Sequence, residues 1–215
     1  MLMLALSSCK ESNKVDRLWD SYLKSMGNME DLKNVKSFVY RSKTEYPMGM
    51  LTEKVWAEYP DKVRYDVRRP DGGTELILIN GTRGMQIIDG DTNELGPDQL
   101  CPYKNFGMIF PEIYYREQGY SMTQFGSQEN DGTFKILINT ECGELIFVFD
   151  EKTEEFIGLN PKGYNLMVRV LEKDIVRGVQ IAKRSSNISN GDTLYTYFDQ
   201  HEVNPVLSDS LFRLE

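Results

Sequence analysis

The first regular pattern in the chain is that of a helix. Apolar side chains recur at spacings of three and four residues over residues 15–26, as they do along one face of an α-helix. Ser12 or Asn13 can cap the start of this helix, and Gly27 is a typical stop. The opposite face carries both acidic and basic residues, so we predict a helix that packs on a core rather than one that lies on a membrane surface. The apolar face consists of Val15, Leu18, Trp19, Tyr22, Leu23 and Met26.

Beyond residue 36 the pattern changes to short runs of β-branched and aromatic residues between turn residues. Alternating apolar and polar side chains are typical of strands, and Asn80-Gly81 between two runs is a strong signal for a two-residue hairpin turn. This succession predicts an antiparallel meander. The predicted strands cover residues 37–43, 50–59, 62–68, 75–79, 83–89, 134–139, 144–150, 156–159, 165–173, 179–184 and 193–199.

Residues 97–120 interrupt the strand pattern. The stretch is rich in aromatic and apolar residues of mixed periodicity and ends near Gly119. We expect it to form a helix packed over the sheet. Two roles remain open for it, a lid over a binding site or a connection that completes the core.

Three of the predicted strands are apolar on both faces. Residues 76–79, 136–138 and 145–149 lack the alternation of a half-exposed sheet. Both faces must then be covered, yet the N-terminal helix and residues 97–120 are little material for so many strands. Either the sheet curls on itself into a barrel or half-barrel, or it encloses a hydrophobic cavity.

Size, charge and the motifs that are missing narrow the functional classes. A chain of 215 residues is sized for one domain. Its 25 basic and 33 acidic residues give a net charge of -8, which opposes binding to nucleic-acid phosphates. The single histidine, His201, disfavours catalytic triads and histidine-rich metal sites. The sequence contains no phosphate-binding loop and no nucleophile elbow, and we predict no enzyme activity, cofactor or metal.

The N-terminal apolar run ends at small residues directly before a cysteine. Leu6-Ser7-Ser8-Cys9 resembles the lipobox of bacterial lipoproteins, in which the leader is cleaved and the cysteine carries acyl chains such as palmitate. The resemblance implies a signal peptide over residues 1–8, a lipidated Cys9 with a tether over residues 9–13, and one domain over residues 14–215. It also implies anchoring in the bacterial cell envelope, at the periplasmic side of the outer membrane. No basic residue precedes the apolar run, which a start codon assigned too late would explain. The alternative is an ordinary free cysteine.

Two further cysteines, Cys101 and Cys142, lie in predicted loops. An exported chain meets oxidising conditions, so a disulfide between them is one option. Nothing in the sequence brings the two residues together, and two free thiols are an equal alternative.

Three segments carry a family resemblance. Residues 56–67 (WAEYPDKVRYDV) and 76–85 (LILINGTRGM) resemble the P-x-K-[FV]-R strand and the following strand-turn-strand pair of the LolA/LolB lipoprotein-carrier superfamily, and residues 204–214 (NPVLSDSLFRL) resemble its closing segment. The resemblance implies a mainly β (α+β) fold, a strongly curved antiparallel half-barrel closed by an N-terminal helix and a mid-chain helical lid. It also implies a hydrophobic cavity that receives acyl chains. Tyr59 stands where the soluble carrier has a functionally important arginine, so the resemblance is weakest at the carrier's release mechanism.

Together these features predict a non-enzymatic, lipid-anchored envelope protein that binds acyl chains of lipids or lipoproteins, in lipid or lipoprotein transport or sorting. Affinity would come from apolar burial, at about 0.8 kcal/mol per CH₂ group. The alternative is an envelope scaffold module whose cavity is filled by its own side chains. The candidate ligand-binding residues, taken from the strand faces, are Trp56, Leu78, Met85, Ile87, Phe147 and Phe149.

Overall fold

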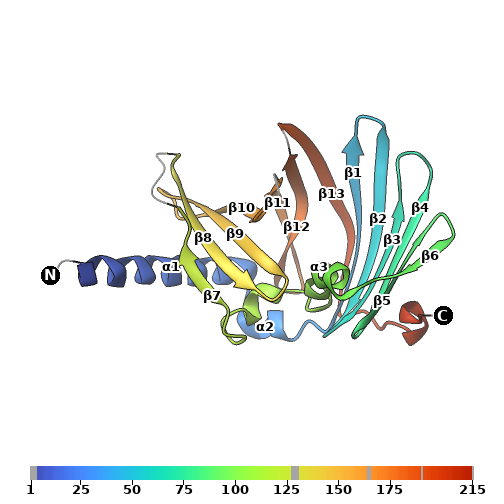
Figure 1. Cartoon of the computed structure of the whole chain (residues 1–215), viewed down its shortest axis with the longest axis horizontal. Coiled ribbons are helices and arrows are strands. Elements are labelled where there is room, and N and C mark those ends of the chain that lie inside the picture. The colour runs from blue at the N-terminus through green and yellow to red at the C-terminus, as the bar shows by residue number, and fades with distance from the viewer. Residues whose placement is uncertain (1–3, 127–130, 164–165, 190, 215) are drawn as a thin grey trace.

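An antiparallel sheet of 13 strands organises the computed structural model, which describes residues 4–126, 131–163, 166–189 and 191–214 (Figure 1). The strand order is β6-β5-β4-β3-β2-β1-β13-β12-β11-β10-β9-β8-β7, so every neighbouring pair except β1 and β13 is consecutive in the chain. This confirms the predicted meander. The strands are β1 (Ser37–Tyr46), β2 (Gly49–Glu58), β3 (Lys62–Arg68), β4 (Thr74–Asn80), β5 (Arg83–Ile88), β6 (Asp91–Glu94), β7 (Ser121–Gln124), β8 (Thr133–Thr140), β9 (Gly143–Asp150), β10 (Phe156–Pro161), β11 (Leu166–Val176), β12 (Val179–Ser189) and β13 (Asp192–Val203).

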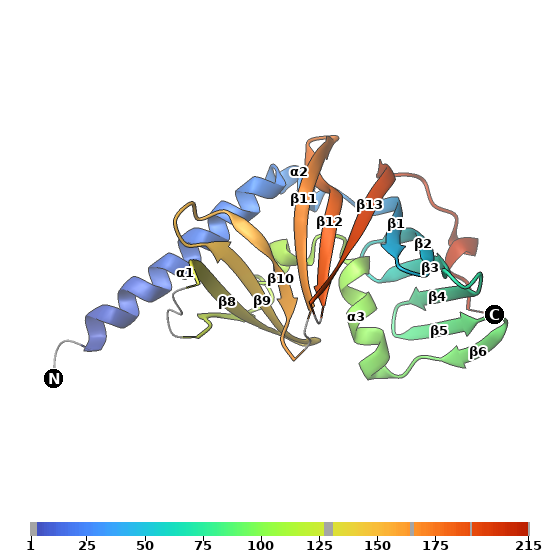
Figure 2. The same ribbon diagram turned by 90° about the horizontal axis from the view of Figure 1, so that it is seen from above.

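The sheet is a strongly curved half-barrel. Strands β1–β6 form one wing and β8–β10 the other, with β11–β13 between them (Figure 2). The edge strands β6 and β7 do not pair with each other, so the sheet does not close into a barrel. The predicted half-barrel is therefore confirmed.

Two hairpins at β5 differ in detail from the sequence-based prediction. Asn80 pairs with Arg83, so the β4–β5 turn lies one residue later than expected and uses the positive φ of Gly81 (64°). Asp89 and Gly90 have φ of 52° and 100°, a pair of positive angles typical of a type I′ turn. That turn leads into β6, whose four exposed polar residues gave no strand signal.

Helix α1 (Leu4–Met26) is longer than expected. It begins at Leu4, so Ser12 and Asn13, the expected caps, lie inside it. Residues 4–14 contain no Gly or Pro that would end a helix, and the helix stops at Gly27, which has φ of 138°. The short α2 (Met29–Lys33) follows.

The apolar face of α1 packs on β7, β8, β9 and β12, in the core-packing role predicted for it. Leu18 and Trp19 have no exposed surface. The ring centroids of Trp19 and Phe147 are 4.9 Å apart in an edge-to-face arrangement, which is favourable for aromatic pairs. The buried cluster beneath α1 includes Val15, Leu18, Trp19, Leu23, Phe134, Ile136, Ile138, Phe147, Phe149, Val179 and Ile181.

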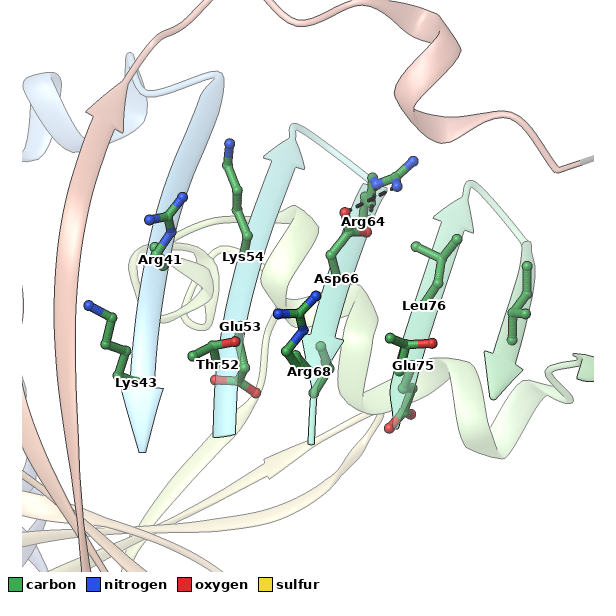
Figure 3. Close-up of a pocket in the computed structure, with 13 residues that line it drawn as sticks. Arg41, Lys43, Thr52, Glu53, Lys54, Arg64, Asp66, Arg68, Glu75 and Leu76 are labelled. Atoms are coloured by element: carbon green, nitrogen blue, oxygen red, sulfur yellow. Dashed lines mark hydrogen bonds and ion pairs between the residues drawn. The ribbon is translucent and has the colours of Figure 1, made fainter. Parts of the chain in front are cut away.

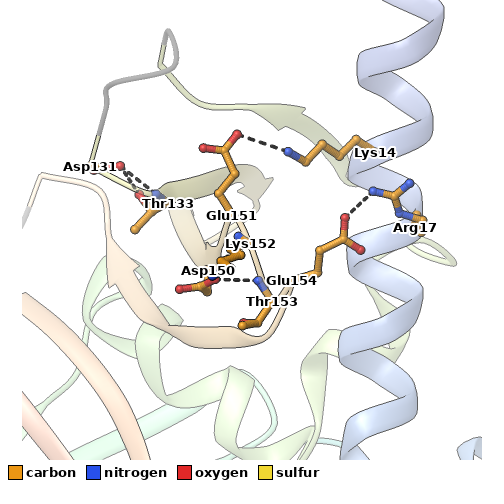
Figure 4. Close-up of polar contacts among 9 residues, drawn as sticks. All are labelled: Lys14, Arg17, Asp131, Thr133, Asp150, Glu151, Lys152, Thr153 and Glu154. Carbon is orange, nitrogen blue, oxygen red and sulfur yellow. Dashed lines mark hydrogen bonds and ion pairs between the residues drawn. The ribbon is translucent and has the colours of Figure 1, made fainter.

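Two ion pairs fix α1 to the turn between β9 and β10 (Figure 4). Lys14 lies 3.5 Å from Glu151, and Arg17 pairs with Glu154. The pairs are partly exposed, so they orient the helix more than they stabilise it.

Helix α3 (Pro97–Gly107) covers the β1–β6 wing, within the segment where a helix was predicted. It packs on β2, β3 and β4. Tyr40 on β1 borders both this cluster and the one beneath α1, so both helices lie on the same face of the sheet, which we call the inner face. The cluster beneath α3 consists of Val55, Val63, Tyr65, Ile77, Ile79, Leu95 and Leu100.

A disulfide links the two wings across the inner face. Cys101 on α3 is bonded to Cys142 in the β8–β9 turn, with 5.2 Å between the two Cα atoms. The alternatives left open by the sequence are thereby resolved in favour of the bond. Because α3 sits on one wing and the turn belongs to the other, the bond holds the half-barrel curved.

The C-terminal segment covers part of the opposite, outer face. The short helix η2 (Asp209–Phe212) packs on β3 and β4, and Arg64 donates from Nη1 to the Leu211 carbonyl (3.4 Å). Phe212 has no exposed surface, and Leu78 on the same face is 5% exposed. The C-terminal segment is therefore a third element that covers the sheet, in addition to α1 and α3, and it was not predicted from the sequence. It explains why β4 has apolar residues on its outer face.

Candidate ligand-binding site

Aromatic side chains gather on the inner face near the meeting point of the α1 and α3 clusters. The ring centroids of Phe38 and His201 are 6.0 Å apart, and those of Tyr40 and Phe198 are 5.8 Å apart. Phe110, directly before the short helix η1 (Pro111–Tyr114), adds a ring 6.3 Å from Phe38. Phe38 is buried, whereas the other four residues are half-buried. We call Phe38, Tyr40, Phe110, Phe198 and His201 the aromatic cluster.

A β-bulge in β13 brings Phe198 and His201 to the same face. Residues three apart on a regular strand point to opposite faces. Here the β1–β13 register shifts between Val39 and Arg41, and Gln200 has φ of 57°. The extra residue turns His201 back to the inner face. Period-two alternation gives no sign of such a bulge, and none of the five residues was among the ligand-binding residues predicted from the sequence.

His201 contributes a polar atom to the aromatic cluster. Its ring stacks on Phe38 and Phe198, with interplanar angles of 27° and 26°. Its Nε2 atom is buried and has no hydrogen-bond partner among the described residues. Burial lowers the pKa of His201, and the charges of Asp174 and Asp199 oppose this shift. The imidazole is therefore neutral at neutral pH, and Nε2 is available for one hydrogen bond with a ligand.

Hydroxyl side chains continue the inner face beyond the cluster. Ser42 and Thr44 follow Tyr40 at alternate positions of β1 and are 0% and 5% exposed. Thr44 Oγ1 lies 2.8 Å from Thr196 Oγ1, and Asn187 donates from Nδ2 to Thr196 Oγ1 (3.3 Å). These hydroxyl groups are buried and already hydrogen-bonded, so the rings of the aromatic cluster form the part of this face that suits an apolar chain.

The carboxyl group of Glu112 lies close to the aromatic cluster in the sequence, two residues after Phe110. Burial raises the pKa of Glu112, in η1, to about 7, and only a hydrogen bond from its own backbone opposes the shift. Burial also raises the pKa of Tyr22 and Tyr115, with a smaller contribution from the charge of Glu112. Among the described residues no Lys, Arg or His forms an ion pair with Glu112. This part of the inner face therefore favours a neutral carboxyl.

We expect Glu112 to make stability fall as pH rises. The folded protein binds this proton more tightly than the unfolded chain, so stability declines between pH 4.5 and about 7 and then levels off. Glu112→Gln should flatten this decline and stabilise the protein most at alkaline pH. Unfolding temperatures of both proteins at about pH 5 and about pH 8 test this. An equal pH dependence in the two proteins would contradict it.

The structure separates the six residues predicted to bind ligand into two groups, neither of which belongs to the aromatic cluster. Phe147 and Phe149 lie in the core beneath α1, 1% and 0% exposed. The other four project from the outer face of the β1–β6 wing: Trp56, Leu78, Met85 and Ile87. The lipidation site predicted at Cys9 lies on α1, in the part whose side chains are outside the described structure, and stays a prediction.

Comparisons with known proteins agree with this architecture. No protein-family model and no curated protein matches the chain. The solved structure of the LolA superfamily protein NE2245 from Nitrosomonas europaea matches with a TM-score of 0.57 and 11% identity, over 89% of this chain and 97% of that one. A DUF1329 family protein from Desulfovibrio piger matches with a TM-score of 0.56 and 11% identity, over 93% of this chain and 97% of that one. The chain therefore has a LolA-like fold, as the sequence resemblance implied.

None of the helices in the described residues is both long enough and apolar enough to cross a membrane.

Proposed function

We propose that this protein binds an apolar chain, such as an acyl group of a lipid or lipoprotein, against the aromatic cluster on the inner face of its half-barrel. The observation that carries the proposal is the half-buried state of Tyr40, Phe110, Phe198 and His201 where the two buried apolar clusters meet. Contiguous apolar side chains that a protein leaves open to solvent commonly mark a binding surface.

Burial of the chain would supply the affinity. Each CH₂ group removed from water contributes about 0.8 kcal/mol, so roughly ten buried groups give ~8 kcal/mol before the cost of association. A polar end group of the ligand would use His201 Nε2. Binding of this kind needs no catalytic group.

The location of the protein forms part of the same proposal. A lipid on Cys9 would attach the N-terminal end of α1 to an envelope membrane, while Val15 and the residues after it keep the helix packed on the sheet. The acyl-binding face would then work beside the membrane that supplies its ligand. The LolA-like fold supports this arrangement for a lipid or lipoprotein carrier or receptor.

Phe198→Ala tests the proposed surface. We expect it to weaken binding of a fluorescent fatty-acid probe about tenfold, which corresponds to ~1.4 kcal/mol of lost apolar contact. Tyr197→Ala is the matched control, because Tyr197 precedes Phe198 on β13, is 39% exposed and faces the other side of the sheet. Its affinity should stay within a factor of two of the wild type.

Two results would count against acyl binding on the inner face. Equal losses of probe affinity in Phe198→Ala and Tyr197→Ala would indicate that the binding site lies outside the aromatic cluster. A wild-type protein that takes up no probe, and that shows only its apo mass in native mass spectrometry, would favour a scaffold with a self-filled interior.

A further inference from the structure

A basic groove lies on the outer face of the β1–β6 wing, on the side of the sheet opposite the aromatic cluster. It has a volume of about 600 Å³, within the range of small-molecule sites. Figure 3 shows Arg41, Lys54 and Arg68 projecting from neighbouring strands β1, β2 and β3 into this space. A positive groove is unexpected on a chain whose net charge is -8.

Three of the groove's cations have no acidic partner in the part of the chain that the structure describes. Arg64 is held by Asp66 through two hydrogen bonds of 2.8 and 3.1 Å, and Lys43 lies 3.4 Å from Asp199. No ion pair involves Arg41, Lys54 or Arg68 within the described ranges of the chain; Lys54 Nζ instead lies over the ring of Trp56, 4.6 Å from its centroid.

The acidic residues at the groove are already engaged. Ser42 donates to Glu53 (2.6 Å) and Gln86 donates to Glu75 (2.6 Å), and both donors belong to the inner face. Asp66 is the acidic side chain of the groove that shares the face of the three cations, and it is bound to Arg64. The cations therefore keep an excess of positive charge in the groove.

The strand register places the three cations close together. Arg41 lies directly opposite Lys54, and Thr52, two residues before Lys54, lies opposite Arg68. Directly opposite residues have Cβ atoms about 5 Å apart and diagonal ones about 7–8 Å apart. Two guanidinium groups and one ammonium group thus line the same groove, with the Thr52 hydroxyl beside them. Their mutual repulsion is relieved by an anion with several oxygen atoms.

We propose that this groove binds the phosphoryl group of a small molecule or a lipid head group. Arginine binds phosphate oxygens in bidentate pairs and lysine adds a point charge, so Arg41, Lys54 and Arg68 together suit a doubly charged phosphomonoester. Leu76 and Ile87 line the end of the groove away from Arg41 and would contact the apolar part of the ligand. The site is independent of the acyl-binding surface, because the two lie on opposite faces of the sheet.

The test compares two triple variants of the full chain with the same change in net charge. The groove variant carries Arg41→Gln, Lys54→Gln and Arg68→Gln. The control variant carries Lys24→Gln, Arg169→Gln and Arg177→Gln, at exposed positions outside the groove. Circular dichroism establishes that both are folded. The probes are glycerol 3-phosphate, followed by calorimetry and by the fluorescence of Trp56, and phosphatidylcholine vesicles with and without phosphatidic acid.

We expect the groove variant to bind the phosphate probe at least tenfold more weakly than the wild type, and the control variant to stay within a factor of two. Binding of glycerol 3-phosphate identifies a soluble phosphate ester as a sufficient ligand, whereas binding only to vesicles with phosphatidic acid identifies the lipid head group. Equal losses of phosphate affinity in the two triple variants would show that the effect comes from the change in net charge, and would overturn the proposal. Wild-type protein that binds neither probe, or that binds a glutamate-rich peptide at this groove instead, would also overturn it.

Discussion

Replacing both Cys101 and Cys142 by serine should lower the free energy of unfolding by about 4 kcal/mol. The bond closes a loop with a sequence separation of 41, and the chain-entropy relation gives about that value for a loop of this length. Urea denaturation of the oxidised protein and of the double variant measures the difference through the shift of the midpoint. Cys9→Ser in both proteins removes the remaining thiol, so that the disulfide is the one redox difference between them.

Reduced wild-type protein is the internal control for this prediction. With the bond opened by a reductant, it should unfold at the midpoint of the double-serine variant, because both lack the same constraint. An oxidised protein no more stable than the variant would mean that the bond does not constrain the unfolded chain. Alkylation of two thiols in the untreated protein would show that the bond does not form.

The disulfide also bears on ligand binding, since it ties α3 to the opposite wing. Phe110 and η1 follow α3 directly in the chain, and Phe110 is part of the aromatic cluster. Loss of the bond should therefore affect the inner face more than the basic groove, which is built from adjacent strands alone. The two proposed sites can be distinguished in this way within one protein.

The sequence was sufficient to predict the meander, because alternation and turn residues act locally. Strands that are apolar on both faces predicted either a sheet curled into a barrel or half-barrel or an enclosed cavity, and the family resemblance favoured the half-barrel. The sequence could not show which side chains of these strands point to the inner face and which to the outer face. In residues 76–79, Ile77 and Ile79 pack beneath α3, while Leu76 and Leu78 lie on the outer face. Four apolar residues in succession look the same from either side, so period-two reasoning had no basis for choosing one pair.

The aromatic cluster was missed for a related reason. Phe198 and His201 share a face only because of the bulge at Gln200, and a bulge depends on pairing with a strand more than 150 residues away in the chain. The positive charge of the groove could not be predicted from the sequence either. Arg41, Lys54 and Arg68 are unremarkable in the sequence, and the cross-strand register of three strands brings them together.

Phe147→Ala should destabilise the protein by about 3–5 kcal/mol, as expected for a large buried aromatic residue. Phe147 is 1% exposed and packs against three aromatic rings. The distances from its ring centroid are 4.9 Å to that of Trp19, 5.5 Å to that of Tyr22 and 5.8 Å to that of Phe156. The matched control is Phe125→Ala. Phe125 is half-buried near the sheet edge, so its replacement should lower the free energy of unfolding by less than about 1.5 kcal/mol because less apolar area is lost.

Urea midpoints of the wild type and the two variants, together with fatty-acid titrations under conditions in which all three are folded, distinguish a packing role from contact with the ligand. If Phe147 is a core residue, its replacement changes the urea midpoint and leaves the fatty-acid affinity of the folded protein near that of the wild type. If Phe147→Ala instead kept the midpoint and abolished binding, Phe147 would line a ligand cavity, as its strand position in the sequence predicted, and the acyl chain would lie beneath α1 rather than on the aromatic cluster.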